Sequence, residues 1–172
     1  MSPQTQIGLP STTQPSWPRL LLLVTAAIET MSGLSNSTIL FADIPDIPGP
    51  GLGGLLIKIS LALHPLFAAA ALIFISTGWV YHAVVALALV LVIEWMNILP
   101  SVRLDDLALS DPGSLFTVIY VLALPVLAIA ATLMISRHPD TAGAPAVLLA
   151  IPTLASIAGV AAFAIGVMIY GF

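Results

Sequence analysis

The sequence predicts an all-α integral membrane protein, a polytopic helical bundle of about five transmembrane helices. Hydrophobic residues make up 59% of the 172 residues and charged residues 7%, whereas soluble domains average about 45–50% and about 25%. Four basic and eight acidic side chains are too few to cover the surface of a soluble domain of this size. Five apolar runs, each near the roughly 20 residues that cross a bilayer, are separated by breaks rich in proline, glycine or charge.

Composition also excludes several kinds of site and partner. The absence of cysteine excludes disulfides, thiolate catalysis and cysteine-based metal sites. Three histidines are too few for a histidine-rich metal cage, and the two within spans, His64 and His82, lie at different depths, which argues against haem held by both. The sequence therefore predicts no metal and no cofactor. The net charge of −4, without a basic patch, predicts no nucleic-acid partner.

Residues 1–17 are polar, rich in proline, serine and threonine, and uncharged, which predicts a disordered tail. Arg19 is the only positive charge near the first apolar run, and no small-residue cleavage site follows, so we expect the tail to be retained rather than cleaved. Residues 18–172 then form a single transmembrane helical domain. Its predicted spans lie near 18–41, 55–77, 79–100, 114–136 and 145–170.

The first span is the least apolar, so four spans plus a weaker first one is the alternative topology. Polar and small residues recur on one face of its predicted helix at steps of three or four: Thr25, Glu29, Ser32, Gly33 and Asn36. A carboxylate in mid-membrane costs about 2.5–3.5 kcal/mol, so this face should point at protein or water rather than lipid. Two interpretations stay open: helix packing with a hydrogen-bonded Glu29, or the wall of a pathway or ligand site.

The second and third spans form a hairpin around a short break at residues 76–79. At 1.5 Å per residue, His64 and Glu94 lie about 22 and 23 Å from that break, which places them at the same depth. Each side chain is costly to bury alone, so we expect the two to pair, as ions or as a neutral hydrogen-bonded pair. Asn97 lies on the same face as Glu94. A structural contact, a catalytic or transport role and unrelated contacts all remain open, because sequence does not fix helix rotation.

The other segments carry less information about function. Residues 43–54 predict a loop on the membrane surface or a re-entrant cap, and residues 101–113 a solvated acidic loop that is a poor metal site. Small residues in the fifth span predict a packing face for an internal helix or another subunit. They recur at four-residue steps and are Ala158, Ala162 and Gly166, followed by Tyr170.

The candidate site is an intramembrane polar cluster, made up of Glu29, Asn36, His64, Glu94 and Asn97. No phosphate-binding loop, zinc-protease motif or nucleophile elbow accompanies it, so catalytic residues stay unassigned and the pattern leans against an enzyme. We expect a non-enzymatic membrane protein, a subunit of a larger membrane complex or a small oligomeric transporter. The alternative is a small membrane enzyme, or a quinone- or lipid-handling protein. It would use four of these residues, Glu29, His64, Glu94 and Asn97.

The expected partners are the lipid bilayer and other membrane subunits or further copies of the chain. Five spans place the two termini on opposite sides of the membrane. Arg19 and Arg137 lie on the N-terminal side, and Lys58 and Arg103 lie on the other side. The orientation that the positive-inside rule predicts therefore depends on few residues. We expect a bacterial inner membrane, with a cytoplasmic N-terminus and the C-terminus on the opposite side.

Overall fold

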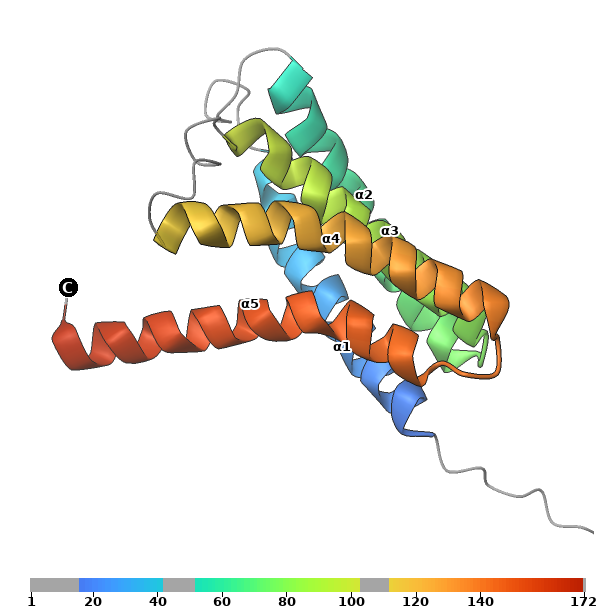
Figure 1. Cartoon of the computed structure of the whole chain (residues 1–172). Helices are drawn as coiled ribbons and strands as arrows, with labels where there is room; N and C mark the ends of the chain where they lie inside the picture. The colour runs from blue at the N-terminus through green and yellow to red at the C-terminus, as the bar shows by residue number, and fades with distance from the viewer. Residues whose placement is uncertain (1–15, 42–51, 103–111, 172) are drawn as a thin grey trace, which may run out of the picture.

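The computed structural model describes residues 16–41, 52–102 and 112–171, and every regular element in these ranges is a helix (Figure 1). The predicted all-α helical bundle is confirmed. The long helices are α1 (Trp17–Asn36), α2 (Leu52–Ser76), α3 (Val80–Ile98), α4 (Pro112–Arg137) and α5 (Gly143–Tyr170). Short 3-10 helices extend two of them, η1 (Ser37–Phe41) after α1 and η3 (Leu99–Ser101) after α3.

Three predictions fall on residues outside the described ranges. Most of the predicted disordered tail, residues 1–15, lies outside them. So do residues 42–51, which hold most of the first predicted loop, and residues 103–111, which hold most of the acidic loop. These three segments stay predictions from sequence.

Four helices are long and apolar enough to cross a membrane, namely α2 to α5. The first helix, α1, does not reach the same standard within the described residues, in keeping with its expected weakness as a span. Its 20 residues still measure about 30 Å, the thickness of the hydrocarbon layer, and it packs against both α2 and α5. That length and packing favour α1 as a fifth span.

Reporter fusions test the fifth span directly. A reporter at residue 1 and a second one after residue 172 are expected to report opposite sides of the membrane, because five crossings reverse the side. A third reporter between residues 138 and 142, in the connection between α4 and α5, should match the N-terminal one. Reporters at the two termini that lie on the same side would show that one helix, most simply α1, does not cross.

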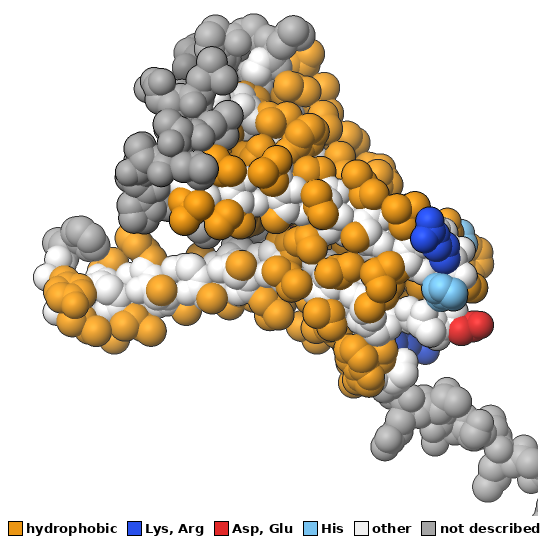
Figure 2. Space-filling view, viewed as in Figure 1, with side chains coloured by type: hydrophobic (Ala, Val, Ile, Leu, Met, Phe, Trp, Pro, Cys, Tyr) orange, Lys and Arg blue, Asp and Glu red, His pale blue; other side chains and the backbone are white. Residues whose placement is uncertain are grey.

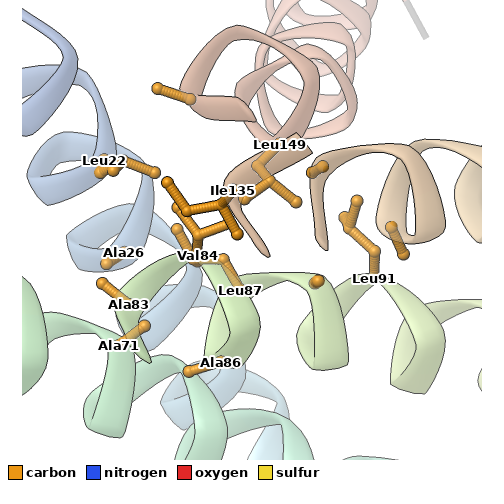
Figure 3. Packing of buried hydrophobic residues seen from close by; sticks show 14 of the residues in the cluster. Leu22, Ala26, Ala71, Ala83, Val84, Ala86, Leu87, Leu91, Ile135 and Leu149 are labelled. Atoms are coloured by element: carbon orange, nitrogen blue, oxygen red, sulfur yellow. The ribbon is translucent and has the colours of Figure 1, made fainter. Parts of the chain in front are cut away.

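The hydrophobic core fills one half of the bundle. Each long helix contributes a large side chain that is fully buried there, and the set is Leu22, Ile75, Val84, Ile135 and Leu149. Figure 3 shows this packing, with alanines between the larger side chains that let the helices approach closely. These residues lie near the start of α1, the turn between α2 and α3, and the connection between α4 and α5. This half of the bundle is therefore tightly packed with apolar side chains.

Arg19 links the start of α1 to the end of α2 by hydrogen bonds. Its Nε donates a hydrogen bond to the carbonyl of Ile75 at 3.2 Å, and its Nη2 donates to the carbonyl of Ser76 at 3.0 Å. The last carbonyls of a helix have no partner within it and carry partial negative charge, so a guanidinium suits that position. The chain then turns at Gly78, whose φ of 87° is readily adopted only by glycine.

We expect Arg19→Met to lower the free energy of unfolding by about 1–2 kcal/mol, because it removes two hydrogen bonds from a charged donor but keeps the aliphatic stem. Arg137→Met is the matched control, since Arg137 is exposed at the end of α4, and a change within about 0.5 kcal/mol is expected there. Unfolding in detergent, followed by circular dichroism, compares the two. Equal losses would show that the Arg19 hydrogen bonds contribute nothing specific.

The surface of the bundle is mostly apolar. Figure 2 shows hydrophobic side chains over the described part of the visible face, with the charged side chains gathered at one end. Arg137, His138 and Asp140 are exposed there, in and beside the connection between α4 and α5. Trp79, in the turn between α2 and α3, and Tyr81, at the start of α3, are also exposed. This distribution is typical of a membrane–water boundary.

The buried residues of α5 are confined to its first half. They all lie between positions 145 and 153, and residues 154–165 are all exposed. Figure 1 shows α5 crossing α1 and its second half extending away from the bundle. Apart from the backbone of α5 itself, no described atom lies within 4 Å of a Cβ added at Gly159 or Gly166. Ala158, Ala162 and Tyr170, three of the four residues predicted to form a packing face in this span, are exposed in the described structure.

Candidate functional site

Glu29 lies near the middle of α1 and joins three helices. Its side chain is buried, although a carboxylate seldom is. The hydroxyl of Thr153 in α5 donates a hydrogen bond to its Oε1. Its Oε2 lies 3.1 Å from Nε2 of His64 in α2, the distance of a hydrogen bond or close ion pair. Both carboxylate oxygens therefore have a partner, which is what allows the group to be buried.

A glycine sets the distance between α1 and α2 at this level. A Cβ atom added at Gly33 would lie 3.0 Å from Cδ2 of His64 and 3.0 Å from both the Cα and the nitrogen of Pro65. Any larger residue would therefore push against the backbone of α2. Pro65 has no N–H, so its nitrogen can lie against α1 without leaving a buried donor unpaired. This contact keeps Glu29 and His64 within hydrogen-bonding distance.

Glu94 of α3 completes a cluster of three ionisable groups. One ligand atom from each of Glu29, His64 and Glu94 lies within 4.8 Å of the other two. We call this set the Glu29–His64–Glu94 cluster. Two carboxylates beside one imidazole can exchange protons with one another or hold a cation between them.

A neutral polar contact lies about one helical turn from the cluster. Oγ of Ser60 in α2 lies 3.2 Å from Oδ1 of Asn97 in α3 and 2.8 Å from the carbonyl of Ile57. Its single hydrogen can go to either acceptor. Asn97 follows Glu94 by three residues, so both point to the same side of α3. The hairpin thus presents a polar face that extends from the cluster toward the end of α3.

A polar cavity of about 210 Å³ borders the cluster. It is lined by Ser32, Gly33, Asn36, Ser60, Leu61, His64, Ile93, Glu94, Asn97 and Ser156. Seven of these ten residues carry a hydroxyl, amide or ionisable group, and the other three are Gly33, Leu61 and Ile93. Asn36 is exposed at the end of α1, so the cavity reaches the molecular surface there.

A second cavity, of about 390 Å³, lies where α5 separates from α1. Its lining is Ile28, Glu29, Ser32, Glu94, Pro152, Thr153, Ser156, Ile157, Val160, Ala161 and Ala164. Ser32, Glu94 and Ser156 line both cavities, so the two meet at the cluster. The polar groups lie at one end of the second cavity, and the wall provided by α5 beyond Ser156 is apolar.

The structure brings the five predicted site residues around this space. Glu29, His64 and Glu94 form the cluster, and Asn36 and Asn97 line the polar cavity. Asn36 is exposed at the end of α1, where it lines the polar cavity. The partner of His64 at hydrogen-bonding distance is Glu29, rather than the Glu94 expected from the hairpin.

Sequence reasoning missed two residues of the site, both in α5. Thr153 binds Glu29, and Ser156 lines both cavities. They are the only serine and threonine between residues 145 and 170, and this isolation in an apolar span is the signal that could have found them. Comparison with protein-family models, with curated proteins and with solved structures finds no match for this chain.

Proposed function

We propose that this chain is a small membrane transport protein that moves a small cation by way of the Glu29–His64–Glu94 cluster. The observation that carries the proposal is the meeting of two cavities at one buried and two half-buried ionisable groups inside an apolar bundle. Intramembrane ionisable groups that border a cavity are typical of ion pathways and proton relays. A purely structural subunit would instead be expected to pair its polar groups in a dry interface.

The two halves of the bundle differ in a way that suits transport. The polar cavity extends from the cluster to the end where α1 and α3 finish and α2 begins. The opposite half holds the packed apolar core. An ion would enter from the cavity side, bind at the cluster and need a rearrangement of helices to leave. In the predicted orientation, that entrance faces away from the cytoplasm of a bacterial inner membrane.

The charge of the site favours a cation as the substrate. Glu29 and Glu94 can together carry two negative charges, and His64 supplies at most one positive charge. The bilayer offers no water to screen the remainder, so a bound proton or metal ion lowers the energy of the site. The serine and asparagine oxygens of the polar cavity can replace part of the hydration shell of an entering cation.

The second half of α5 supports an oligomer, or a subunit of a larger membrane complex. Residues 154–165 are all exposed in the described chain, yet several of them form one wall of the second cavity. A neighbouring copy or a different subunit on that face would close the cavity on its open side. The proposal therefore includes at least one further chain.

Ion flux into proteoliposomes tests the proposal. The full chain, reconstituted in lipid vesicles, is expected to move protons or metal ions down an imposed gradient, recorded with a pH-sensitive or metal-sensitive dye inside the vesicles. Glu94→Gln should reduce the flux to that of protein-free vesicles, because it removes a charge from the point where the cavities meet. Asp140→Asn is the matched control, since Asp140 is exposed at the end of the bundle, and its flux should equal that of the unmodified chain.

Two results would contradict transport. One is that vesicles with the unmodified chain take up protons and every cation tried no faster than protein-free vesicles do. The other is equal flux through Glu94→Gln and the unmodified chain, which would place the pathway away from the cluster.

A second candidate is a small membrane enzyme, or a quinone- or lipid-handling protein. The observation that favours it is the second cavity, whose apolar wall on α5 and polar end at Glu29 and Glu94 suit an amphiphile with a polar head. Mass spectrometry of lipids and quinones that co-purify with the chain tests it. One bound amphiphile per chain would support this candidate over transport if Val160→Trp abolished the binding. Ile119→Trp is the control and should keep the amphiphile, because Ile119 is exposed on α4.

A further inference from the structure

The arrangement of the Glu29–His64–Glu94 cluster resembles a set of metal ligands more than a chain of proton carriers. Two ligands held about 2.0–2.1 Å from a tetrahedral ion are about 3.3 Å apart. Oε2 of Glu29 and Nε2 of His64 lie 3.1 Å apart, so these two are already spaced for a shared ion. The ligand atom of Glu94 lies within 4.8 Å of both, a gap that rotation of one side chain can close.

The next layer of contacts orients Glu29 as a ligand. The Thr153 hydroxyl donates to Oε1, which leaves Oε2 directed at His64. Hydrogen bonds of this kind fix ligating carboxylates in metalloproteins. The Thr153 side chain is itself buried. Only one carboxylate oxygen of Glu29 is therefore held toward the centre of the cluster.

Three protein ligands leave coordination positions open, and the cavities lie where those positions would be. Glu94 lines both cavities and His64 lines the polar one. Water or the hydroxyls of Ser32 and Ser156 can complete the coordination. Closed sites with four protein ligands hold ions for structure, whereas open sites keep a position for exchange. An open site suits an ion that must enter and leave.

The chemistry of the ligands selects the class of ion. Magnesium and calcium favour sites made of oxygen alone, whereas an imidazole nitrogen suits zinc, iron and related ions. The absence of cysteine removes the thiolates preferred by copper(I). Two carboxylates also neutralise a doubly charged ion without the help of His64, which can then remain a neutral ligand.

We infer that the Glu29–His64–Glu94 cluster binds a divalent first-row transition metal ion, such as Mn²⁺, Fe²⁺, Co²⁺ or Zn²⁺. This inference rests on the proposed function and deepens it, because it names the class of cation that is transported. Binding itself is a property of the cluster alone and can be measured without any transport.

Titration with Co²⁺ tests the inference on the full chain, purified in detergent and stripped with a chelator. We expect one Co²⁺ per chain, seen as visible absorption bands, with Zn²⁺ displacing it and a hundredfold excess of Mg²⁺ or Ca²⁺ failing to do so. His64→Gln and Glu94→Gln should each weaken binding by at least about 100-fold, since loss of an outer hydrogen bond alone costs 10–100-fold. Thr153→Val should weaken it by about tenfold.

His82→Gln and Asp140→Asn are the matched controls, because both residues are exposed and lie outside the cluster. Their Co²⁺ affinity should equal that of the unmodified chain. A second measurement uses the unmodified chain and so does not depend on the folding of a variant. Pulsed electron paramagnetic resonance of bound Mn²⁺ should show coupling to a single imidazole nitrogen, and the same signal should persist in His82→Gln.

The outcomes distinguish a failure of the metal inference from a failure of the proposed transport. Binding that is equally strong in His64→Gln, binding of Mg²⁺ as tight as that of Co²⁺, or no nitrogen coupling would each overturn the metal inference. Proton flux through vesicles without metal binding would overturn it too, yet leave transport standing. Metal binding at the cluster with no flux of any cation would support the metal site and overturn the proposed transport.

Discussion

Gly33→Leu is expected to lower the free energy of unfolding by about 3 kcal/mol or more, at the upper end of what overpacking a helix interface costs. The Cβ alone would meet the Cα and nitrogen of Pro65 at 3.0 Å. Backbone atoms cannot rotate away as a flexible side chain can, so α1 and α2 must separate. Unfolding of the purified chain by denaturant in mixed micelles, followed by circular dichroism, measures the loss.

Gly159→Leu provides the matched control for this substitution. Gly159 also lies inside a long helix, and apart from that helix's own backbone no described atom lies within 4 Å of a Cβ added there. Its replacement should leave stability unchanged or raise it by about 0.5–1 kcal/mol, because glycine is a poor helix former. Similar losses for the two variants would show that the contact between Gly33 and Pro65 does not set the helix spacing.

His64→Ala is expected to cost about 3–5 kcal/mol, the usual penalty for removing one partner of a buried ionic pair. Oε2 of Glu29 would then lose its partner at 3.1 Å while its carboxylate stays buried. Glu29→Gln should be far milder, at about 1 kcal/mol, because an amide keeps hydrogen bonds to both Thr153 and the imidazole. Thermal unfolding in detergent compares the two variants.

A double-mutant cycle identifies the partner of His64. The coupling energy between His64→Ala and Glu29→Gln should lie well above about 0.5 kcal/mol, as for residues in contact. The coupling between His64→Ala and Glu94→Gln should be smaller, because Glu94 belongs to the cluster without that 3.1 Å contact. Additive effects in the first cycle would mean that Glu29 and His64 do not interact in the membrane.

Depth along each helix could be predicted from the sequence, and rotation about each helix could not. Counting from the turn at residues 76–79 placed His64 and Glu94 at one level, and the structure holds both in one cluster. The same count says nothing about the direction in which a side chain points. The closer partner of His64 comes from α1, whose position beside α2 depends on the contact at Gly33.

The contribution of α5 was beyond sequence reasoning for a related reason. Thr153 lies 124 residues from Glu29 along the chain, and no periodic pattern links positions so far apart. The polar face of α1 was recognisable because its members recur at helical steps within a single segment. Pairing between helices depends on tertiary packing, which a single sequence reveals only by the isolated threonine and serine of the fifth span.

We expect the divergence of α5 from α1 to make the site sensitive to the thickness of the bilayer. With 28 residues, α5 is about 42 Å long, whereas the 20 residues of α1 give about 30 Å, close to the hydrocarbon thickness. A helix longer than the membrane relieves the mismatch by tilting. The second cavity lies between α1 and α5, in the wedge where the two helices diverge. Lipids with longer acyl chains would draw α5 more upright, narrow the wedge beside Glu29, and so make membrane composition a regulator of access to the cluster.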